Sequence, residues 1–242
     1  MTSATVTAHD LVERCATELA SRRDPERVPA MEAYMRHQFA FLGVMSAGQK
    51  AAFRAATDGL PRALPEDVVV DAAEELWRRP EREHQYLACL LVNRHAARST
   101  ATPALLPTLG HLLSTRPWWD TVDSLATHAV GDLVRRHPEL QATMDRWLAG
   151  DDMWLSRSAL LHMNRWREAT DQDWLFAACL RLAGHTDFFV RKAIGWALRE
   201  RSKTDERAVV AFVGEHGARL SGLSRREALM WLERRRRGEA KF

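Results

Sequence analysis

Trp119-Asp120-Thr121-Val122-Asp123 is the first of three similar segments that decide the fold. The other two are Met153-Trp154-Leu155-Ser156-Arg157 and Asp187-Phe188-Phe189-Val190-Arg191. Each opens with bulky apolar residues in the manner of a helix start and ends on a charged residue, at intervals of 34 positions (123 to 157 to 191). A repeat in the thirties with two helices per unit is typical of an α-solenoid, whose equivalent positions line up along one concave face. We therefore expect Asp123, Arg157 and Arg191 to share a groove.

Helical spacing continues through most of the chain. Leu87, Leu90 and Leu91 follow the i, i+3, i+4 pattern, and Pro and Gly residues fall between such stretches. Asp152 and Asp171 precede predicted helices, and Ser224 with Glu227 three positions later predicts a capping box. No segment alternates as a strand would, so we predict an all-α solenoid. Its helical array covers 25–232, after an N-terminal helix or cap at 1–24 and before a basic tail at 233–242.

Composition excludes several classes of protein. Of the 242 residues 46% are hydrophobic and 28% charged, which is enough for a packed core. The three cysteines are far apart, and no apolar run approaches a membrane span or a secretory signal, so we expect a cytoplasmic protein without disulfides. No phosphate-binding glycine loop, zinc motif or serine elbow is present, and we expect neither a metal nor a cofactor. The net charge of +3 permits nucleic-acid binding but does not require it.

Trp119 and Asp123 are the first candidates for chemistry. They are four residues apart and share one helical face. An indole beside a carboxylate suits a cationic, sugar-like species, because both groups attract positive charge. The competing interpretation makes Trp118 and Trp119 core residues and Asp120 a helix N-terminal charge. Spacing alone favours that structural interpretation.

Basic residues gather in a second group. Arg157 has the planar fork that suits phosphate, although such a residue is commonly an exposed helix arginine, here within reach of Asp151 or Asp152. The segment after Asp187 combines Trp196 with the small Gly195, which would let another helix or a ligand approach. Around them lies a predicted basic cluster: Arg191, Lys192, Arg199 and Lys203.

Together these blocks resemble the AlkD-type DNA alkylation repair family. The similar segments are 118–123, 154–157 and 188–200, with weaker likeness at 34–44 and 223–228, and the resemblance runs in collinear order from about Pro25 to Leu232. It implies a solenoid of HEAT-like helical pairs with a basic concave cleft for duplex DNA. It also implies a monofunctional DNA glycosylase that removes cationic N3- and N7-alkylated purines without a base-binding pocket, as a monomer associated with the nucleoid.

The resemblance assigns roles to particular residues. Asp123 corresponds to the catalytic carboxylate, Trp119 and Trp196 to the pair that flanks the deoxyribose, and Arg157 to an arginine that contacts the DNA backbone. Tyr34 corresponds to a tyrosine beside the lesion. The segment Val44–Lys50 departs from the family's pattern, which weakens the assignment of Lys50 and Arg54 as phosphate contacts. Three other functions remain open: a member acting on bulky toxin-derived adducts, a non-catalytic DNA-binding protein, and a protein–protein scaffold.

Overall fold

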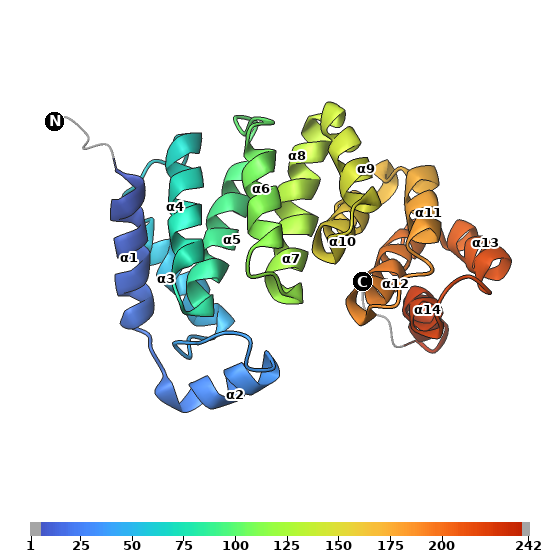
Figure 1. The fold of residues 1–242 in the computed structure, drawn as a ribbon, viewed down its shortest axis with the longest axis horizontal. Helices are drawn as coiled ribbons and strands as arrows, with labels where there is room; N and C mark the ends of the chain where they lie inside the picture. The colour runs from blue at the N-terminus through green and yellow to red at the C-terminus, as the bar shows by residue number, and fades with distance from the viewer. Residues whose placement is uncertain (1–5, 239–242) are drawn as a thin grey trace. The chain divides into compact units, whose positions relative to one another are not determined.

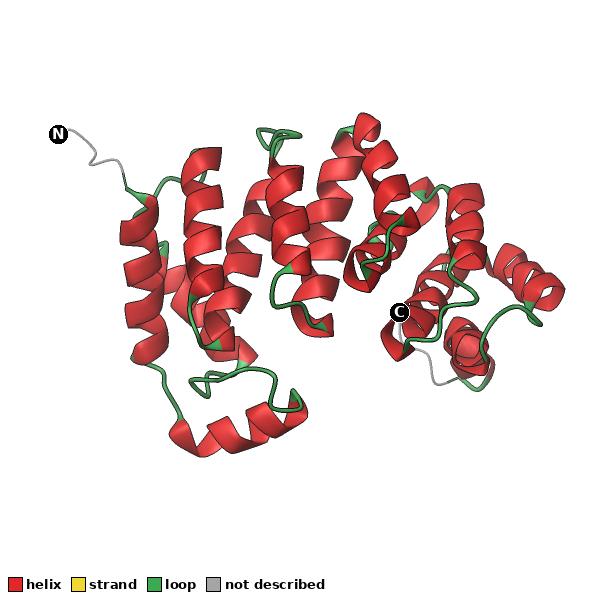
Figure 2. Ribbon diagram, viewed as in Figure 1, coloured by secondary structure: helices red, strands yellow, loops and turns green. Residues whose placement is uncertain are grey.

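The computed structural model describes residues 6–238, and this part of the chain consists of helices and loops without a strand (Figure 2). The all-α prediction is therefore confirmed. The outermost residues of the predicted cap and tail, 1–5 and 239–242, lie outside the described residues. No helix between residues 6 and 238 has both the length and the apolar character to cross a bilayer.

Contacts divide the chain into two compact units, 1–112 and 113–242. The first is drawn in blue to green in Figure 1. Its elements are α1 (Ala8–Ala20), a short 3₁₀ helix (Pro25–Arg27), α2 (Val28–Tyr34), α3 (Ser46–Ala56), α4 (Glu66–Arg78) and α5 (Arg82–Ala96), and the boundary lies in α6 (Leu105–Ser114). The single array predicted over 25–232 stays a prediction.

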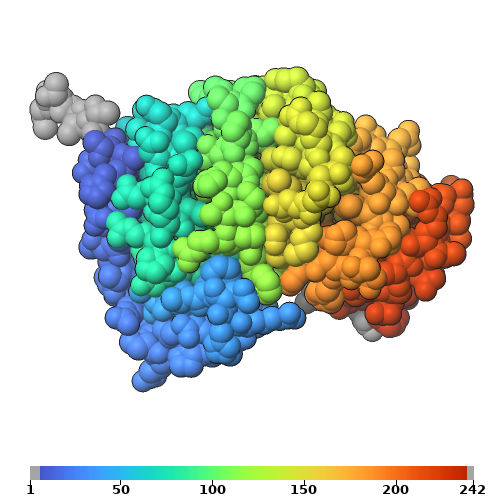
Figure 3. Space-filling model, viewed as in Figure 1, coloured from blue at the N-terminus to red at the C-terminus, as the bar shows by residue number. Residues whose placement is uncertain are grey.

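Leucine, valine and alanine side chains build the core of the first unit. Leu11, Val12 and Leu19 of α1 are fully buried, as is Leu76 of α4. Their spacing places them on one stripe of each helix, which explains why α1 and α4 pack together. On the face drawn in Figure 3 the side chains of these two helices close the space between their ribbons.

A buried carboxylate organises the segment that follows α2. Glu83, near the start of α5, accepts hydrogen bonds from the backbone N–H groups of Leu42 (3.0 Å), Gly43 (2.9 Å) and Val44 (3.0 Å). Gly43 has a φ of +88°, and an added Cβ would lie 1.9 Å from the Asp24 carbonyl oxygen, so only glycine fits. Burial raises the pKa of Glu83, while the three N–H groups act in the opposite direction.

The second unit contains the three repeated segments. Its elements are α7 (Trp119–Leu125), a π-helix (Ala126–Val130), α8 (Gly131–Arg136), a 3₁₀ helix (Pro138–Leu140), α9 (Gln141–Ala149), α10 (Met153–Leu161), a 3₁₀ helix (Arg167–Ala169), α11 (Gln172–Arg181), α12 (Phe188–Ser202), α13 (Glu206–His216) and α14 (Gly222–Arg236). The segments open α7, α10 and α12, whose first residues are 119, 153 and 188. The repeat thus marks structurally equivalent helices, as predicted.

The helix N-termini follow the sequence with one correction. Asp152 and Asp171 cap α10 and α11 through backbone N–H groups of the first turn, as predicted. The predicted capping box at Ser224 is wrong. Ser221 is the N-cap of α14 and accepts from the Ser224 N–H (3.0 Å), whereas the Ser224 hydroxyl donates to the Arg191 carbonyl (2.8 Å). A side chain that bonds another helix is unavailable for capping its own.

Gly195 sets the distance between α12 and α14. An added Cβ would lie 2.3 Å from Glu227 Cβ and 2.8 Å from the Ser224 carbonyl oxygen. The absent side chain therefore lets the two helices approach closely, so of the two predicted uses of this space, a helix or a ligand, the structure shows a helix. This packing determines the surroundings of the charged residues on α12.

Candidate functional site

Asp123 and Arg157 form a buried ion pair in the second unit. Arg157 donates from Nε to Asp123 Oδ1 (2.7 Å) and from Nη2 to Oδ2 (2.8 Å), which is the bidentate geometry of the strongest carboxylate–guanidinium pairs. The Arg157 side chain is 4% exposed and that of Asp123 is 18% exposed. The predicted proximity of these two repeat positions is therefore correct, and the alternative pairing of Arg157 with Asp151 or Asp152 is wrong.

The Arg157 guanidinium has a third partner. Its Nη1 donates to the backbone carbonyl of Phe189 at the start of α12. Arg157 thus joins α7, α10 and α12 through one side chain. With Nε, Nη1 and Nη2 all engaged and almost no exposed surface, Arg157 is placed to hold Asp123 in position. Its contact with a DNA phosphate stays a prediction.

Asp123 is a carboxylate under two opposing influences. Burial raises its pKa, and the hydrogen bonds and charge of Arg157 lower it. Burial is the larger effect, so the net direction is upward. The remaining exposed edge of Asp123 is therefore a partly desolvated negative charge. Such a charge acts strongly on a positive centre beside it, because little water screens the interaction.

An aromatic cluster adjoins the ion pair through Phe189, whose carbonyl accepts from Arg157. The rings of Trp118, Trp154 and Phe189 have centroids 5.1–5.9 Å apart in tilted or edge-on contact. Trp154 is buried, whereas Trp118, for which the competing interpretation expected a core position, is partly buried. The cluster fixes the loop before α7 against α10 and α12. Trp119, the next residue, begins α7 and is only partly buried.

A π-helix follows α7 directly. Thr127, the second residue of this π-helix, donates its hydroxyl to the Asp123 carbonyl (2.7 Å). Single π turns within helices are frequent at functional sites. Here the turn also brings Gly131 so close to α10 that an added Cβ would lie 2.3 Å from the His162 carbonyl oxygen. The π-helix therefore fixes how α7 and α10 pack, which determines the Asp123–Arg157 contact.

Trp196 lies on α12, partly buried, and has a partner that the sequence interpretation missed. Its Nε1 donates to Glu200 Oε1 (3.2 Å), and Glu200 also accepts from Lys203 Nζ (2.7 and 2.6 Å). The i, i+4 spacing of Trp196 and Glu200 was a signal that could have identified this pair. Glu200 thereby holds the indole in one orientation and places a carboxylate at its edge.

Two glutamates neutralise part of the charge of the predicted basic cluster. Glu227 on α14 accepts from Lys192 Nζ (3.3 Å) and Arg199 Nη1 (2.6 Å), while Arg191 Nε donates to the His185 carbonyl (2.8 Å). Lys203 pairs with Glu200 in the same way. Sequence alone gave no signal for the role of Glu227, since the contact depends on the close approach of α14 at Gly195. Lys192 and Lys203 keep nearly half of their side-chain surface exposed.

The remaining predicted residues belong to the first unit. Tyr34 ends α2 and is 71% exposed, and Arg36 and His37 beyond it both have φ near +55°. Left-handed non-glycine residues are uncommon and cluster at functional segments. Lys50 and Arg54 lie exposed on α3. Their roles in DNA contact remain predictions.

Fold and site together define an all-helical protein with a buried carboxylate–guanidinium ion pair and partly buried tryptophans. The family model of the DNA alkylation repair enzymes matches residues 15–232, and the chain belongs to this family. A solved structure described as a predicted DNA alkylation repair enzyme from Enterococcus faecalis shares 29% sequence identity with this chain. The two superimpose with a TM-score of 0.79, covering 87% of this chain and 97% of that chain. No curated protein matches.

Proposed function

We propose that the protein is a monofunctional DNA glycosylase that hydrolyses the N-glycosidic bond of cationic N3- and N7-alkylated purines in duplex DNA. The observation that carries the proposal is the partly exposed Asp123 carboxylate, held in bidentate contact by the buried Arg157 in a DNA alkylation repair enzyme. The helical pairs would form HEAT-like repeats, and the enzyme would act as a monomer at the first step of base excision repair.

The chemistry follows from the charge of the substrate. A base with a formal positive charge leaves readily, because the electrons of the breaking C1′–N bond neutralise it. Positive charge then develops on the deoxyribose, and the oxygen of a water molecule forms the new bond to C1′ while a proton passes to solvent. No general acid is required, and no lysine nucleophile is part of the proposal.

Asp123 would stabilise the developing oxocarbenium charge and orient the water. Because Arg157 fixes both carboxylate oxygens before the substrate arrives, little reorganisation is needed in the transition state. The pairing also disfavours Asp123 as a strong base. Its role is therefore electrostatic stabilisation and water orientation.

Trp119 and Trp196 would flank the deoxyribose. The face of an indole attracts positive charge, and this attraction grows as the sugar becomes cationic. Glu200 adds to the effect at Trp196, since a carboxylate that accepts from Nε1 increases the electron density of the ring. The two tryptophans thus favour the transition state over the ground state.

DNA affinity would rest on exposed or partly buried basic and aromatic residues of both units. These are Tyr34, Lys50 and Arg54 in the first unit and Arg191, Lys192, Arg199 and Lys203 in the second. Phosphate contacts of this kind position the duplex and carry no base specificity. For Lys192 and Arg199, a phosphate would replace or share the Glu227 carboxylate that now holds them.

Release of free base tests the proposal. Duplex DNA containing N7-methylguanine is incubated with wild type, Asp123→Asn or Asp151→Asn, and the released base is measured by mass spectrometry. Asp151 is an exposed carboxylate next to α10 and is the matched control. We expect Asp123→Asn to lose about 100-fold or more of the rate, the scale for removal of one preorganised electrostatic group. Equal rates for all three proteins would refute the role of Asp123.

A further inference from the structure

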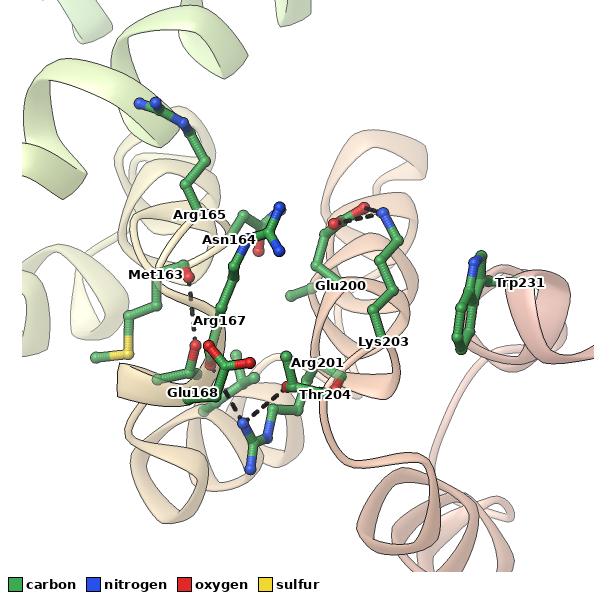
Figure 4. A pocket seen from close by; sticks show the side chains of 13 residues that line it. Met163, Asn164, Arg165, Arg167, Glu168, Glu200, Arg201, Lys203, Thr204 and Trp231 are labelled. Atoms are coloured by element: carbon green, nitrogen blue, oxygen red, sulfur yellow. Dashed lines mark hydrogen bonds and ion pairs between the residues drawn. The ribbon is translucent and has the colours of Figure 1, made fainter. Parts of the chain in front are cut away.

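A cavity of about 660 Å³ lies in the second unit, beyond Trp196 along α12. Its walls are the chain between α10 and α11, the C-terminal part of α12, and Trp231 of α14 (Figure 4). The volume falls in the range of small-molecule and cofactor sites. None of its lining residues takes part in the Asp123–Arg157 pair. The cavity is therefore a separate feature of the surface.

One wall presents an uncommitted cation. The guanidinium of Arg167 has neither a hydrogen-bond nor an ion-pair partner in the part of the chain that the structure describes, and Arg167 has a φ of +55°. A non-glycine residue in the left-handed region costs free energy, and such residues cluster at ligand sites. The Arg167 carbonyl accepts from Arg201 Nη1 (3.2 Å), which holds the strained loop in place.

An unsatisfied amide lies in the same wall. Asn164 Nδ2 is buried without a hydrogen-bond partner among the described residues. Buried polar groups are nearly always paired, because an unpaired donor is costly. A ligand atom that accepts a hydrogen bond would satisfy this donor after a small rotation of the side chain. Arg167 and Asn164 together favour an anion at this end of the cavity.

The opposite side of the cavity is aromatic. Figure 4 shows the indole of Trp231 across the cavity from Arg167, with Glu200 and Lys203 of α12 between them. Trp231 is only partly buried, and the Arg235 guanidinium lies over its ring, 5.4 Å from the centroid, so a ligand would stack on the ring surface that Arg235 does not cover. Stacking on an indole favours a planar aromatic group, and nucleobases stack in this way without sequence preference. Glu200, which accepts from Trp196 Nε1 and lies between Arg167 and Trp231, supplies acceptors for the N–H groups of a base.

We propose that this cavity binds one deoxynucleotide, with its phosphate at Arg167 and Asn164 and its base at Trp231. In a DNA complex the nucleotide would be one near the damaged residue and held outside the helix, since Ala197, the residue after Trp196 on α12, lines the cavity. The proposal goes beyond the glycosylase activity and does not require it. It predicts a ligand larger than phosphate alone, because the cation and the indole lie on opposite sides.

Calorimetric titration of the full chain with deoxyadenosine monophosphate, inorganic phosphate and deoxyadenosine tests the site. We expect the nucleotide to bind at millimolar concentration or below, and each of the other two probes to bind about fivefold more weakly or less, as expected when a charged contact or a stack is absent. A single-stranded oligonucleotide and a paired duplex form the second pair of probes. Their comparison distinguishes a nucleotide outside the helix from one within it.

Substitutions assign the contacts. Arg167→Asn removes the cation and tolerates the left-handed backbone, Trp231→Leu removes the stack, and Trp231→Phe keeps an aromatic face. Arg219→Asn changes an exposed arginine outside the cavity as the control. We expect Arg167→Asn and Trp231→Leu to weaken the nucleotide and the single strand about fivefold or more, and the duplex less. Trp231→Phe should restore most of the binding.

Two results would overturn the proposal. The first is no nucleotide binding, or binding that neither Arg167→Asn nor Trp231→Leu weakens although both variants melt as wild type does. The second is phosphate bound as tightly as the nucleotide and unaffected by Trp231→Leu, which would make the cavity an anion site only. Base release from alkylated DNA is measured separately. Failure of that assay would count against the glycosylase and leave the cavity result intact.

Discussion

Removal of the Arg157 guanidinium tests whether the Asp123 ion pair is as desolvated as its geometry indicates. In Arg157→Gln, the carboxylate loses two charged hydrogen bonds and keeps only its 18% exposed surface for solvation. Loss of one partner from a buried pair costs about 3–5 kcal/mol, and the partial exposure of Asp123 places this case at about 3 kcal/mol. That is a large part of the stability of an ordinary domain.

The double variant Arg157→Gln/Asp123→Asn leaves no unpaired charge. We therefore expect its free energy of unfolding to exceed the value for additive effects by about 1–2 kcal/mol, within the range measured for residues in contact. Urea denaturation followed by tryptophan fluorescence is the assay. Eight of the nine tryptophans lie in residues 113–242, so the signal reports mainly on the second unit.

The effect of pH gives an independent check. Without Arg157 the influence that lowers the pKa of Asp123 is lost, and burial raises it further above its value in the unfolded chain. Between these two pKa values the folded variant binds more protons than the unfolded one, so its stability increases as pH falls. The stability difference from wild type should therefore be largest at pH 7 and smaller at pH 5. A loss below about 1 kcal/mol, or a difference independent of pH, would refute the reasoning.

Three further predictions concern other buried or paired groups. Burial lowers the pKa of His162 to about 4, so the free energy of unfolding should fall by up to about 3 kcal/mol as the pH is lowered from the usual histidine pKa to 4. His162→Leu should remove this part of the pH dependence. Equal slopes of unfolding free energy against pH in wild type and variant would contradict the prediction. Glu83→Gln should lower the free energy of unfolding by about 1–3 kcal/mol, because one of the three backbone N–H groups of residues 42–44 loses its acceptor. An unchanged denaturation midpoint would show that these hydrogen bonds do not stabilise the fold. Glu227→Gln should strengthen DNA binding and steepen its logarithmic salt dependence, by about one unit for each of Lys192 and Arg199 that gains a phosphate; an unchanged slope would place both outside the interface.

Local sequence patterns predicted much of the site's framework. The spacing of Asp123 and Arg157 identified equivalent helix positions, and these residues meet because equivalent helices stack in register. The capping prediction at Ser224 failed, because a Ser–Glu spacing occurs by chance within a helix and Ser221 was the better placed residue. Local patterns are reliable only where neighbours in sequence are also neighbours in space.

Long-range contacts account for what the sequence did not reveal. The sequence predicted that Lys192 and Arg199 belong to a basic surface. Glu227 of α14 pairs with both, because Gly195 lets α14 approach α12 closely. The free Arg167 and the indole of Trp231 are 64 positions apart, and no motif joins them. Such groups meet only through tertiary packing, and local sequence motifs do not predict contacts between residues so far apart in the chain.

The charge of the leaving base is the centre of the proposed mechanism. The decisive measurement compares release of N7-methylguanine and of uracil from otherwise identical duplexes by the wild-type protein under single-turnover conditions. The account predicts release of the cationic base, slowed by Trp119→Ala and Trp196→Ala, and no uracil release above the rate without enzyme. Uracil released as fast as N7-methylguanine would contradict it, because the protein would then have to supply the proton or the base pocket that the mechanism does without.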